Sequence, residues 1–373
     1  MPLEVIQHQE SHKTTLPQKS LSALQKHLPR SVAIKTNERY NSHWIKFISW
    51  FAISYSTAFL FSQELDFGLI LAGYLAELIE DCLEKNTGPT AVEQASSAIK
   101  YQFQMAGYKP CPFNHPYCSR IISAAKNQLV AKSIKRIPFT SEILFQVIDY
   151  HLSNIDTPLN IYMHLVCALL GFVGFLRFDD ISHILVHDDF IKVIENKDHT
   201  IQGVLVYIYT SKTDKQCKGS YIGIGATGKK YCPVKLLFKL LEKGEYIRSH
   251  PTQDCGPLLR ATKVVARTKF QASSLKLAQV LSTTPIPPLS RSSFAKSINR
   301  LCWEARIPNA DYFKLHSLRS GGSTAAIIKG HSNALVCKQG RWKFGNTMEE
   351  HYLKIHHVAI KKVFEMTRSI WPY

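Results

Sequence analysis

The longest apolar run in the chain, residues 164–176, most constrains what the chain can fold into. This run, HLVCALLGFVGFL, contains no lysine, arginine, aspartate or glutamate. It is too short and too interrupted to cross a bilayer, which takes about 20 apolar residues, so it is expected to form a buried helix. Thr157 and Pro158 provide a cap and a first-turn residue for this helix, which should end at Leu176. Arg177 follows directly, so its charge is expected to border a hydrophobic core.

Residues 34–130 have the pattern of a small all-α domain, and 373 residues are enough for two domains. The first helix is expected to have Thr36 or Asn37 as its cap and a core-facing stripe formed by Tyr40, Trp44, Phe47, Ile48 and Phe51. The second should follow Asp66 and bury Leu69, Ile70, Leu75, Leu78, Ile79 and Leu83. A third is expected from Ala91 to Met105, and a fourth with Pro116 in its first turn.

Two basic segments flank this helical block. Residues 1–33 are polar, contain prolines and lack sustained periodicity, so they are expected to form a flexible basic arm with room for one short helix. Residues 131–139, AKSIKRIPF, are basic and lack apolar periodicity, so they are interpreted as an interdomain linker. Residues 140–373 would then form the second domain.

The second domain is expected to be mainly helical with a small antiparallel sheet. Alternating apolar residues at 204–208 and again at 221–224 predict a β-hairpin across a lysine-rich turn. Helices are expected from a Ser141 cap, from Cys232-Pro233 to Leu241, and from a Ser290 cap through Phe294, Ile298 and Leu301. Residues 245–288 are loop-rich and basic, and the pattern there predicts no element.

The charge of the chain indicates a polyanionic partner. Lys and Arg total 46 against 28 Asp and Glu, which gives a net charge of +18. Self-repulsion opposes such an imbalance, and nucleic acid fits it better than a membrane surface does. The amino terminus has no apolar signal-peptide core, and the nine scattered cysteines are typical of free thiols in a reducing compartment. Cys111, His115 and Cys118 lie close together but lack an evident fourth ligand, so no metal site is expected.

The stretch from Leu315 to Leu353 carries the candidate chemistry. His316 and Arg319 are three residues apart, so on a helix they share a face and can reach one ligand. The run Ser320-Gly321-Gly322-Ser323 would allow close backbone approach and expose amides to an anion. A Gly-Arg-Trp-Lys segment at 340–343 and Tyr352 follow. The His-Arg pair alone would be a solvated helix face, but the whole ordered set indicates a phosphate site with a tyrosine as attacking group.

This set resembles the carboxy-terminal signature of the tyrosine recombinases, in which His-x-x-Arg precedes a glycine followed by His or Trp and then a tyrosine. The sequences HSLRSGG and GRWK are most similar to those of the recombinases of DIRS-type retrotransposons. The segment TNERYNSHWIKFISW at the start of the helical block resembles the core-binding domain of the same family. The resemblance implies the recombinase catalytic fold for residues 140–373, with domains that close around duplex DNA.

The family pattern implies a role for each matching residue. Arg177 and Arg319 would bind the scissile phosphate, with Asp180 as the acid that orients their surroundings. Trp342 would donate its indole N–H to a phosphate oxygen, and His316 would accept a proton. Lys212, in the predicted hairpin, would be the general acid and Tyr352 the nucleophile.

Further basic residues are expected to contact DNA phosphates without reading sequence. They are Lys132, Lys135 and Arg136 in the linker, Lys215 and Lys218 near the hairpin turn, and Arg341 and Lys343 around Trp342. Lys215 and Lys218 are equally interpreted as solvated charges.

The predicted activity is metal-independent cleavage and rejoining of duplex DNA through a 3′-phosphotyrosine, without a cofactor, for a mobile element. Self-assembly as a dimer or tetramer on DNA is expected, in a nucleus if the cell is eukaryotic and otherwise in the cytoplasm. Two alternatives remain. One is a catalytically decayed DNA-binding relative, favoured by the slightly long spacing of ten positions from Trp342 to Tyr352. The other is relaxation of supercoils like that of a type IB topoisomerase.

The charge balance predicts that affinity for duplex DNA falls steeply with salt. Each phosphate that the protein neutralises releases condensed counterions, so several contacts should give a log–log salt slope of about −5 or steeper. Fluorescence anisotropy of a labelled duplex across a salt series measures this slope. A slope near zero would remove nucleic acid as the main partner.

Overall fold

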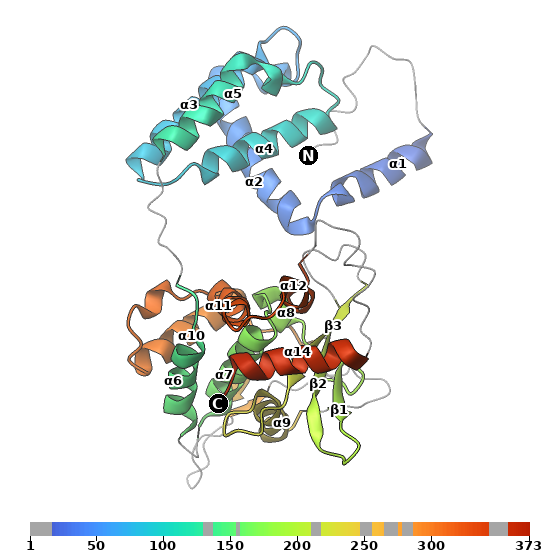
Figure 1. Cartoon of the computed structure of the whole chain (residues 1–373). Helices are drawn as coiled ribbons and strands as arrows, with labels where there is room; N and C mark the ends of the chain where they lie inside the picture. The colour runs from blue at the N-terminus through green and yellow to red at the C-terminus, as the bar shows by residue number, and fades with distance from the viewer. Residues whose placement is uncertain are drawn as a thin grey trace. The chain divides into compact units, whose positions relative to one another are not determined.

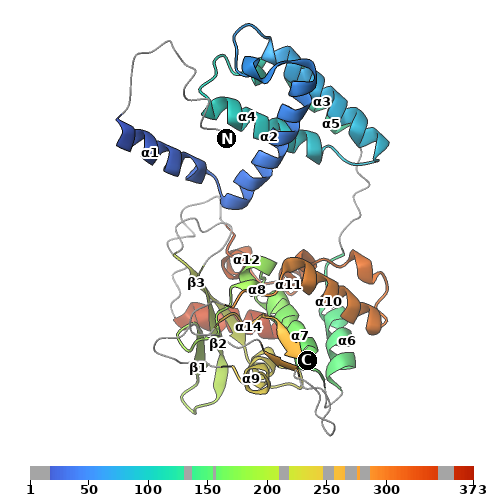
Figure 2. The same ribbon diagram turned by 180° about the vertical axis from the view of Figure 1, so that it is seen from behind.

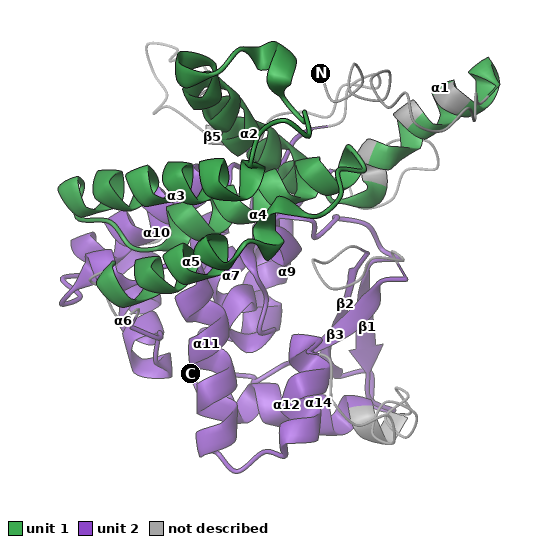
Figure 3. Cartoon of the chain, turned by 90° about the horizontal axis from the view of Figure 1, so that it is seen from above, with its two compact units in different colours: residues 1–133 green, residues 134–373 purple. Residues whose placement is uncertain are grey.

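The structure is a computed structural model, and it describes residues 17–129, 137–153, 157–209, 218–246, 256–264, 275–277, 286–342 and 357–373. Its internal contacts divide the chain into two compact units, residues 1–133 and 134–373 (Figure 3). The division falls within the segment 131–139 that the sequence analysis interprets as a linker. Each unit has a hydrophobic core of its own.

The described part of unit 1 is helical. Its helices are α1 (Gln18–His27), α2 (Ile34–Ser54), α3 (Phe67–Glu84), α4 (Thr90–Met105) and α5 (Pro116–Gln128). The expected aromatic stripe of α2 does enter the core: Phe47 and Phe51 are fully buried, and Phe47 contacts the ring of Tyr74. These aromatic side chains therefore serve packing, as their helical spacing predicted.

Three local expectations for unit 1 were wrong. Helix α2 begins at Ile34 with Ala33 as its N-cap and no side-chain cap, so neither Thr36 nor Asn37 caps it. Leu69 and Leu83 are exposed on α3, whose buried stripe passes through Leu71 and Leu75. At 100° per residue, Leu69 points away from that stripe. Leu83 lies in the last turn of the helix.

Unit 2 combines helices with a small antiparallel sheet, so the predicted fold class is confirmed (Figures 1 and 2). Its helices are α6 (Ser141–Leu152), α7 (Leu159–Val173), α8 (Phe178–Ser182), α9 (Pro233–Lys243), α10 (Arg291–Glu304), α11 (Leu315–Ile328), α12 (Asn333–Gly340) and α14 (His357–Ile370). Its strands are β1 (Ile191–Glu195), β2 (Ile201–Ile208) and β3 (Ser220–Gly225), in that order, with a separate pair β4 (Thr262–Val264) and β5 (Leu275–Leu277).

The predicted hairpin is present, with Val206 opposite Ile222 in the register of β2 and β3. Strand β1, which pairs with the other edge of β2, was not predicted. The β4–β5 pair lies within residues 245–288, where no element was expected. Ser290 caps α10 as predicted, since its hydroxyl accepts the backbone N–H of Ser293 at 3.1 Å.

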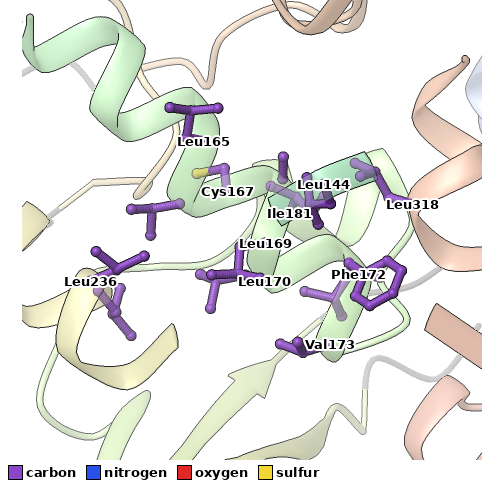
Figure 4. Close-up of a cluster of buried hydrophobic side chains, with 14 of the residues drawn as sticks. Leu144, Leu165, Cys167, Leu169, Leu170, Phe172, Val173, Ile181, Leu236 and Leu318 are labelled. Carbon is purple, nitrogen blue, oxygen red and sulfur yellow. The ribbon is translucent and has the colours of Figure 1, made fainter. Parts of the chain in front are cut away.

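Helix α7 is the centre of the unit 2 core, as the apolar run predicted. Figure 4 shows its side chains between Leu236 of α9 and Leu318 of α11. The helix ends at Val173 rather than Leu176, because Gly174 caps it and Phe175 then takes a left-handed conformation with φ of 50°. Thr157 does not cap it, since the Thr157 hydroxyl instead donates to the His151 carbonyl oxygen at 2.6 Å.

A similar shift of one residue occurs at α6. Its N-cap is Thr140, whose hydroxyl accepts the backbone N–H of Ile143 at 3.3 Å, and Ser141 is the first helical residue. Caps of neighbouring hydroxyl residues are hard to separate from sequence because either side chain can accept the same backbone donors.

The glycine pair in α11 serves packing rather than anion binding. Gly321 and Gly322 are buried in the middle of the helix. Their amides therefore do not form the exposed anion site that was expected. A β-carbon at Gly321 would overlap the carbonyl oxygen of Phe139, and one at Gly322 would overlap that of Phe172. The close backbone approach that the sequence indicated is therefore an approach of α11 to Phe139 before α6 and to Phe172 of α7.

Glycines also let α14 lie directly on the sheet, where it packs on β3 (Figures 1 and 2). A β-carbon at Gly203 or Gly223 would fall 2.8 or 2.7 Å from Phe364 or Val363, respectively. Arg368 then donates to the carbonyl oxygens of Ala226 and Gln202 at 2.8 and 2.7 Å. The last described helix is thus anchored to its own sheet.

A pair of glycine substitutions tests this packing. Gly322→Ala should destabilise the protein by about 1–3 kcal/mol, because the new methyl group overlaps a backbone carbonyl of α7 that cannot swing aside. Gly73→Ala in α3 is the matched control, since nothing lies within 4 Å of its would-be β-carbon and alanine favours a helix by about 0.5–1 kcal/mol. Urea unfolding followed by circular dichroism measures both. Equal stability of the two variants would contradict the tight contact of α11 with α7.

Candidate functional site

Arg319 is the most deeply buried arginine of the candidate site. Its side chain on α11 is 1% exposed. One Nη group donates to the carbonyl oxygen of Phe175, and the other donates to that of Gly340 at 2.5 Å. The guanidinium carbon lies 4.1 Å from the centroid of the Trp342 ring, a cation–π arrangement. Arg319 therefore connects α11 with the turn after α7 and with the end of α12.

The ends of α7 and α12 present these carbonyl groups because both turn sharply. Phe175 is left-handed after the Gly174 cap, and Arg341 is left-handed after Gly340, with φ of 54°. The backbone N–H groups of Arg341 and Trp342 bond back to the carbonyl oxygens of Lys338 and Cys337. A β-carbon at Gly340 would overlap the Trp342 ring, so glycine is needed there.

Asp180 holds the second and third arginines of the site. Its carboxylate is fully buried, and Oδ2 accepts the backbone N–H of Arg177 at 2.8 Å, which caps the short helix α8. The same oxygen lies 2.5 Å from Nη2 of Arg341 and 4.0 Å from Nη1 of Arg319. The Arg341 contact is an ion pair by distance but lacks hydrogen-bond geometry. Asp180 thus contacts the side chains of two arginines and the backbone of a third. We call Arg177, Arg319 and Arg341 the arginine cluster.

The arginine cluster carries more positive charge than the described residues around it neutralise. Burial is the largest cause that lowers the pKa of Arg319 to about 9, the charge of Arg177 lowers it further, and Asp180 offsets part of this. Burial likewise lowers the pKa of Arg341, which Asp180 partly restores. Guanidinium groups nevertheless stay protonated at neutral pH, so the cluster is a buried cation.

Several donors of the cluster have no partner among the described residues. They are Nη1 of Arg177, Nε of Arg319, and Nε and Nη1 of Arg341. A buried donor without an acceptor is costly, so these groups favour an anion with several oxygens. A phosphate group matches this need because guanidinium forks bind its oxygens in pairs.

The structure brings Arg177, Asp180, Arg319 and Trp342 close together. His316 lies one turn before Arg319 on α11, but its side chain is exposed while that of Arg319 is buried. Lys218 is exposed at the start of the β3 segment, where its carbonyl oxygen accepts the Tyr207 hydroxyl at 3.0 Å. The predicted residues Lys132, Lys135, Arg136, Lys212, Lys215, Lys343 and Tyr352 lie outside the described residues.

Two features of the site were not predicted. Arg341, expected to be a DNA contact of the same kind as Lys343, is instead about nine-tenths buried against Asp180. Gln339 is 2% exposed, and its amide bonds both the N–H and the carbonyl oxygen of Gly223, which ties α12 to β3. The sequence offered one signal for Arg341: it directly follows Gly340, at the end of a helix, where a residue in the left-handed conformation is common.

No metal site or membrane helix is found among the described residues. They contain no cluster of three or more His, Cys, Asp or Glu side chains that would hold a metal ion. Cys118, one of the three closely spaced candidates, directs its thiol at the carbonyl oxygen of Gly68 at 3.2 Å. None of the described helices is both long and apolar enough to span a bilayer.

Comparison with known proteins identifies the fold. No family model and no curated protein matches the sequence. The XerH site-specific recombinase bound to a palindromic difH substrate matches in structure with a TM-score of 0.54 and 13% identity, over 100% of this chain and 95% of that chain. Its pre-cleavage complex matches with a TM-score of 0.52 and 14% identity, over 99% and 94%. A lambda integrase dimer bound to a COC′ core site gives 0.48 and 15%, over 91% and 96%. The chain therefore has the tyrosine recombinase fold.

Removal of the central guanidinium should loosen the site. Arg319→Ala leaves the buried carbonyl oxygens of Phe175 and Gly340 without their donor, so the free energy of unfolding should fall by about 2 kcal/mol or more. Arg306→Ala, an exposed arginine in the same unit, should stay within about 0.5 kcal/mol of wild type. Chemical denaturation compares the two. An Arg319→Ala protein as stable as wild type would show that these bonds do not hold the segments together.

Proposed function

We propose that this protein is a site-specific DNA recombinase or integrase that cleaves and rejoins duplex DNA through a 3′-phosphotyrosine. The observation that carries this proposal is the arginine cluster, with its buried donors that lack partners among the described residues. A phosphodiester would supply the missing oxygens. The net charge of +18 and the tyrosine recombinase fold favour duplex DNA as the source of that phosphodiester.

In the proposed reaction, the hydroxyl oxygen of Tyr352 attacks the scissile phosphorus while the bond from phosphorus to the 5′ oxygen breaks. His316 accepts the tyrosine proton, and Lys212 protonates the departing 5′ oxygen. The energy of the broken bond is retained in the phosphotyrosine, so rejoining to another strand needs neither ATP nor a metal ion. Positioning and charge stabilisation carry most of the catalysis in such transfers.

The arginines would stabilise the charge that develops on the phosphoryl oxygens. Arg177 has an unpartnered Nη1 and Arg319 an unpartnered Nε, so each retains a donor for an oxygen. Asp180 would keep Arg177 in place through the backbone bond that begins α8. Trp342 stacks on Arg319, and we propose that its indole N–H also reaches a phosphate oxygen.

Contacts outside the cluster would hold the duplex. Lys132, Lys135 and Arg136 in the segment 131–139, together with Lys215, Lys218 and Lys343, would bind phosphates on either side of the cleaved bond. We propose a dimer or tetramer on DNA, because exchange between two duplexes requires more strand cleavages than one tyrosine can hold at once. We propose that the protein serves a DIRS-like mobile element, because its HSLRSGG and GRWK motifs resemble those of DIRS-type recombinases.

A second candidate is a DNA-binding protein of the same fold that has lost catalysis. The ten positions between Trp342 and Tyr352 favour it, because a longer tether would move the tyrosine away from the phosphate. A topoisomerase would form the same phosphotyrosine but relax supercoiled plasmid as its product. A covalent protein–DNA adduct would distinguish a recombinase from the DNA-binding alternative, which forms none. Relaxation of plasmid without strand exchange would indicate a topoisomerase instead of a recombinase.

The decisive experiment is capture of a covalent protein–DNA adduct. The full chain is incubated with a random-sequence duplex library, quenched with denaturant, and the DNA-linked protein is isolated and mapped by peptide mass spectrometry. Phosphate is expected on Tyr352, the yield should be unaffected by a chelator, and Arg177→Ala should reduce the rate about 100-fold or more.

Two tyrosine variants sharpen this experiment. Tyr352→Phe should abolish the adduct. Tyr373→Phe is the matched control, because the Tyr373 ring packs on Phe145 with centroids 4.1 Å apart and should not reach a phosphate. An adduct that survives Tyr352→Phe would end the assignment of the nucleophile, and the absence of any adduct would favour the DNA-binding alternative.

A further inference from the structure

Arg341 has an unusual position for a residue that only neutralises a carboxylate. It occupies the left-handed position after α12, which favours glycine, and it is about nine-tenths buried. Strain of this kind is kept where surrounding structure and function require the side chain. Its Nη2 faces Asp180, while its Nε and Nη1 have no partner among the described residues. Two of the three guanidinium nitrogens, Nε and Nη1, are therefore still available to a ligand.

The charges of the cluster also leave a role for a third arginine. Arg177, Arg319 and Arg341 carry three positive charges, and Asp180 is the carboxylate that contacts the guanidinium groups of Arg319 and Arg341 and the backbone N–H of Arg177. Within the described residues the cluster thus retains two positive charges. A phosphodiester has one negative charge, but attack by a tyrosine oxyanion creates a transition state with two. With Arg341, the net charge of the cluster equals in magnitude the charge of the transition state. Without Arg341, it would equal only the charge of the bound substrate.

Arg319 differs from the other two arginines in how its donors are used. Both Nη groups of Arg319 already bond backbone carbonyl oxygens, and Nε is its one nitrogen without a partner among the described residues. Arg177 and Arg341 each retain an unpartnered Nη1. The backbone N–H of Arg177 and the Nη2 of Arg341 share the same carboxylate oxygen of Asp180, at 2.8 and 2.5 Å.

We propose that Arg341 is a third catalytic arginine that binds a non-bridging oxygen of the scissile phosphate and stabilises the second negative charge of the transition state. This inference rests on the proposed function, because it assigns a residue to that reaction. Asp180 positions Arg341 and Arg177 together, and Arg319 holds the two turns that carry them. A residue with a purely structural role would affect folding but not the dependence on phosphate charge.

The first test needs no DNA. Thermal unfolding of wild type, Arg341→Gln and Arg306→Gln is measured in inorganic phosphate and in chloride at equal ionic strength. Arg306 is the matched control because it is also left-handed, with φ of 56°, but exposed. Phosphate should raise the melting temperature of wild type and of Arg306→Gln in a saturable way, and Arg341→Gln should lose that rise. An equal rise in Arg341→Gln, or none in wild type, would overturn the proposal.

The second test uses a duplex recovered by adduct capture. Single-turnover cleavage by Arg341→Gln should be about 100-fold slower than by wild type, with unchanged duplex affinity. On the same duplex with a methylphosphonate at the cleaved position, which removes one negative charge, the two proteins should cleave at similar rates. The same deficit on both substrates would show that Arg341 acts through structure alone.

A double variant separates a folding defect from a direct role of Arg341, and phosphate binding is measured independently of DNA cleavage. If Arg341→Gln fails to fold because Asp180 loses its ion pair, Asp180→Asn/Arg341→Gln removes both charges, keeps an acceptor for the Arg177 N–H, and undergoes the same comparisons. Cleavage restored to wild type in that double variant would refute a direct role for Arg341. If wild type forms no adduct with any duplex, the proposed function fails, whereas the phosphate arm still decides whether Arg341 belongs to the anion site.

Discussion

The buried guanidinium of Arg319 is the contact on which the candidate site depends. It joins the carbonyl oxygens of Phe175 and Gly340, which are 165 positions apart in the sequence, from a helix that belongs to neither turn. Each of these turns ends a helix and begins the segment that carries another arginine, Arg177 or Arg341. Because a guanidinium presents rigid, divergent donors, it fixes both turns at once. A lysine has neither the fork nor the reach for this arrangement.

The same arrangement makes the site electrostatically unfavourable without an anion. The three guanidinium groups repel one another, and Asp180 offsets only part of that repulsion. The hydrophobic packing of unit 2 supplies the opposing stability. Its main parts are α7, whose side chains are buried on every face, and the direct contact of α11 with α7 at Gly322. A destabilised, pre-organised charge cluster in a rigid core is typical of a site that stabilises charge during a reaction.

The sheet and the last described helix support the cluster from the opposite side. Gln339, one residue before Gly340, bonds Gly223 of β3, and Val363 of α14 packs on that same glycine. The end of α12 is therefore held between the α7 turn and the sheet. Arg341 inherits this rigidity, which is why its left-handed conformation and its contact with Asp180 can persist together.

Local sequence patterns alone determined much of the fold. The apolar run at 164–176 identified the buried helix, alternation at 204–208 and 221–224 identified the hairpin, and Ser290 identified the start of α10. The family resemblance predicted one site that contains Arg177, Asp180, Arg319 and Trp342. Only the tertiary structure decided that Leu69 is exposed, that β1 completes the sheet, that Gly321 and Gly322 pack rather than bind, and that Arg341 is buried against Asp180. The physical reason is that periodicity and capping depend on neighbours along the chain, whereas burial and charge pairing depend on whatever segment lies opposite in space.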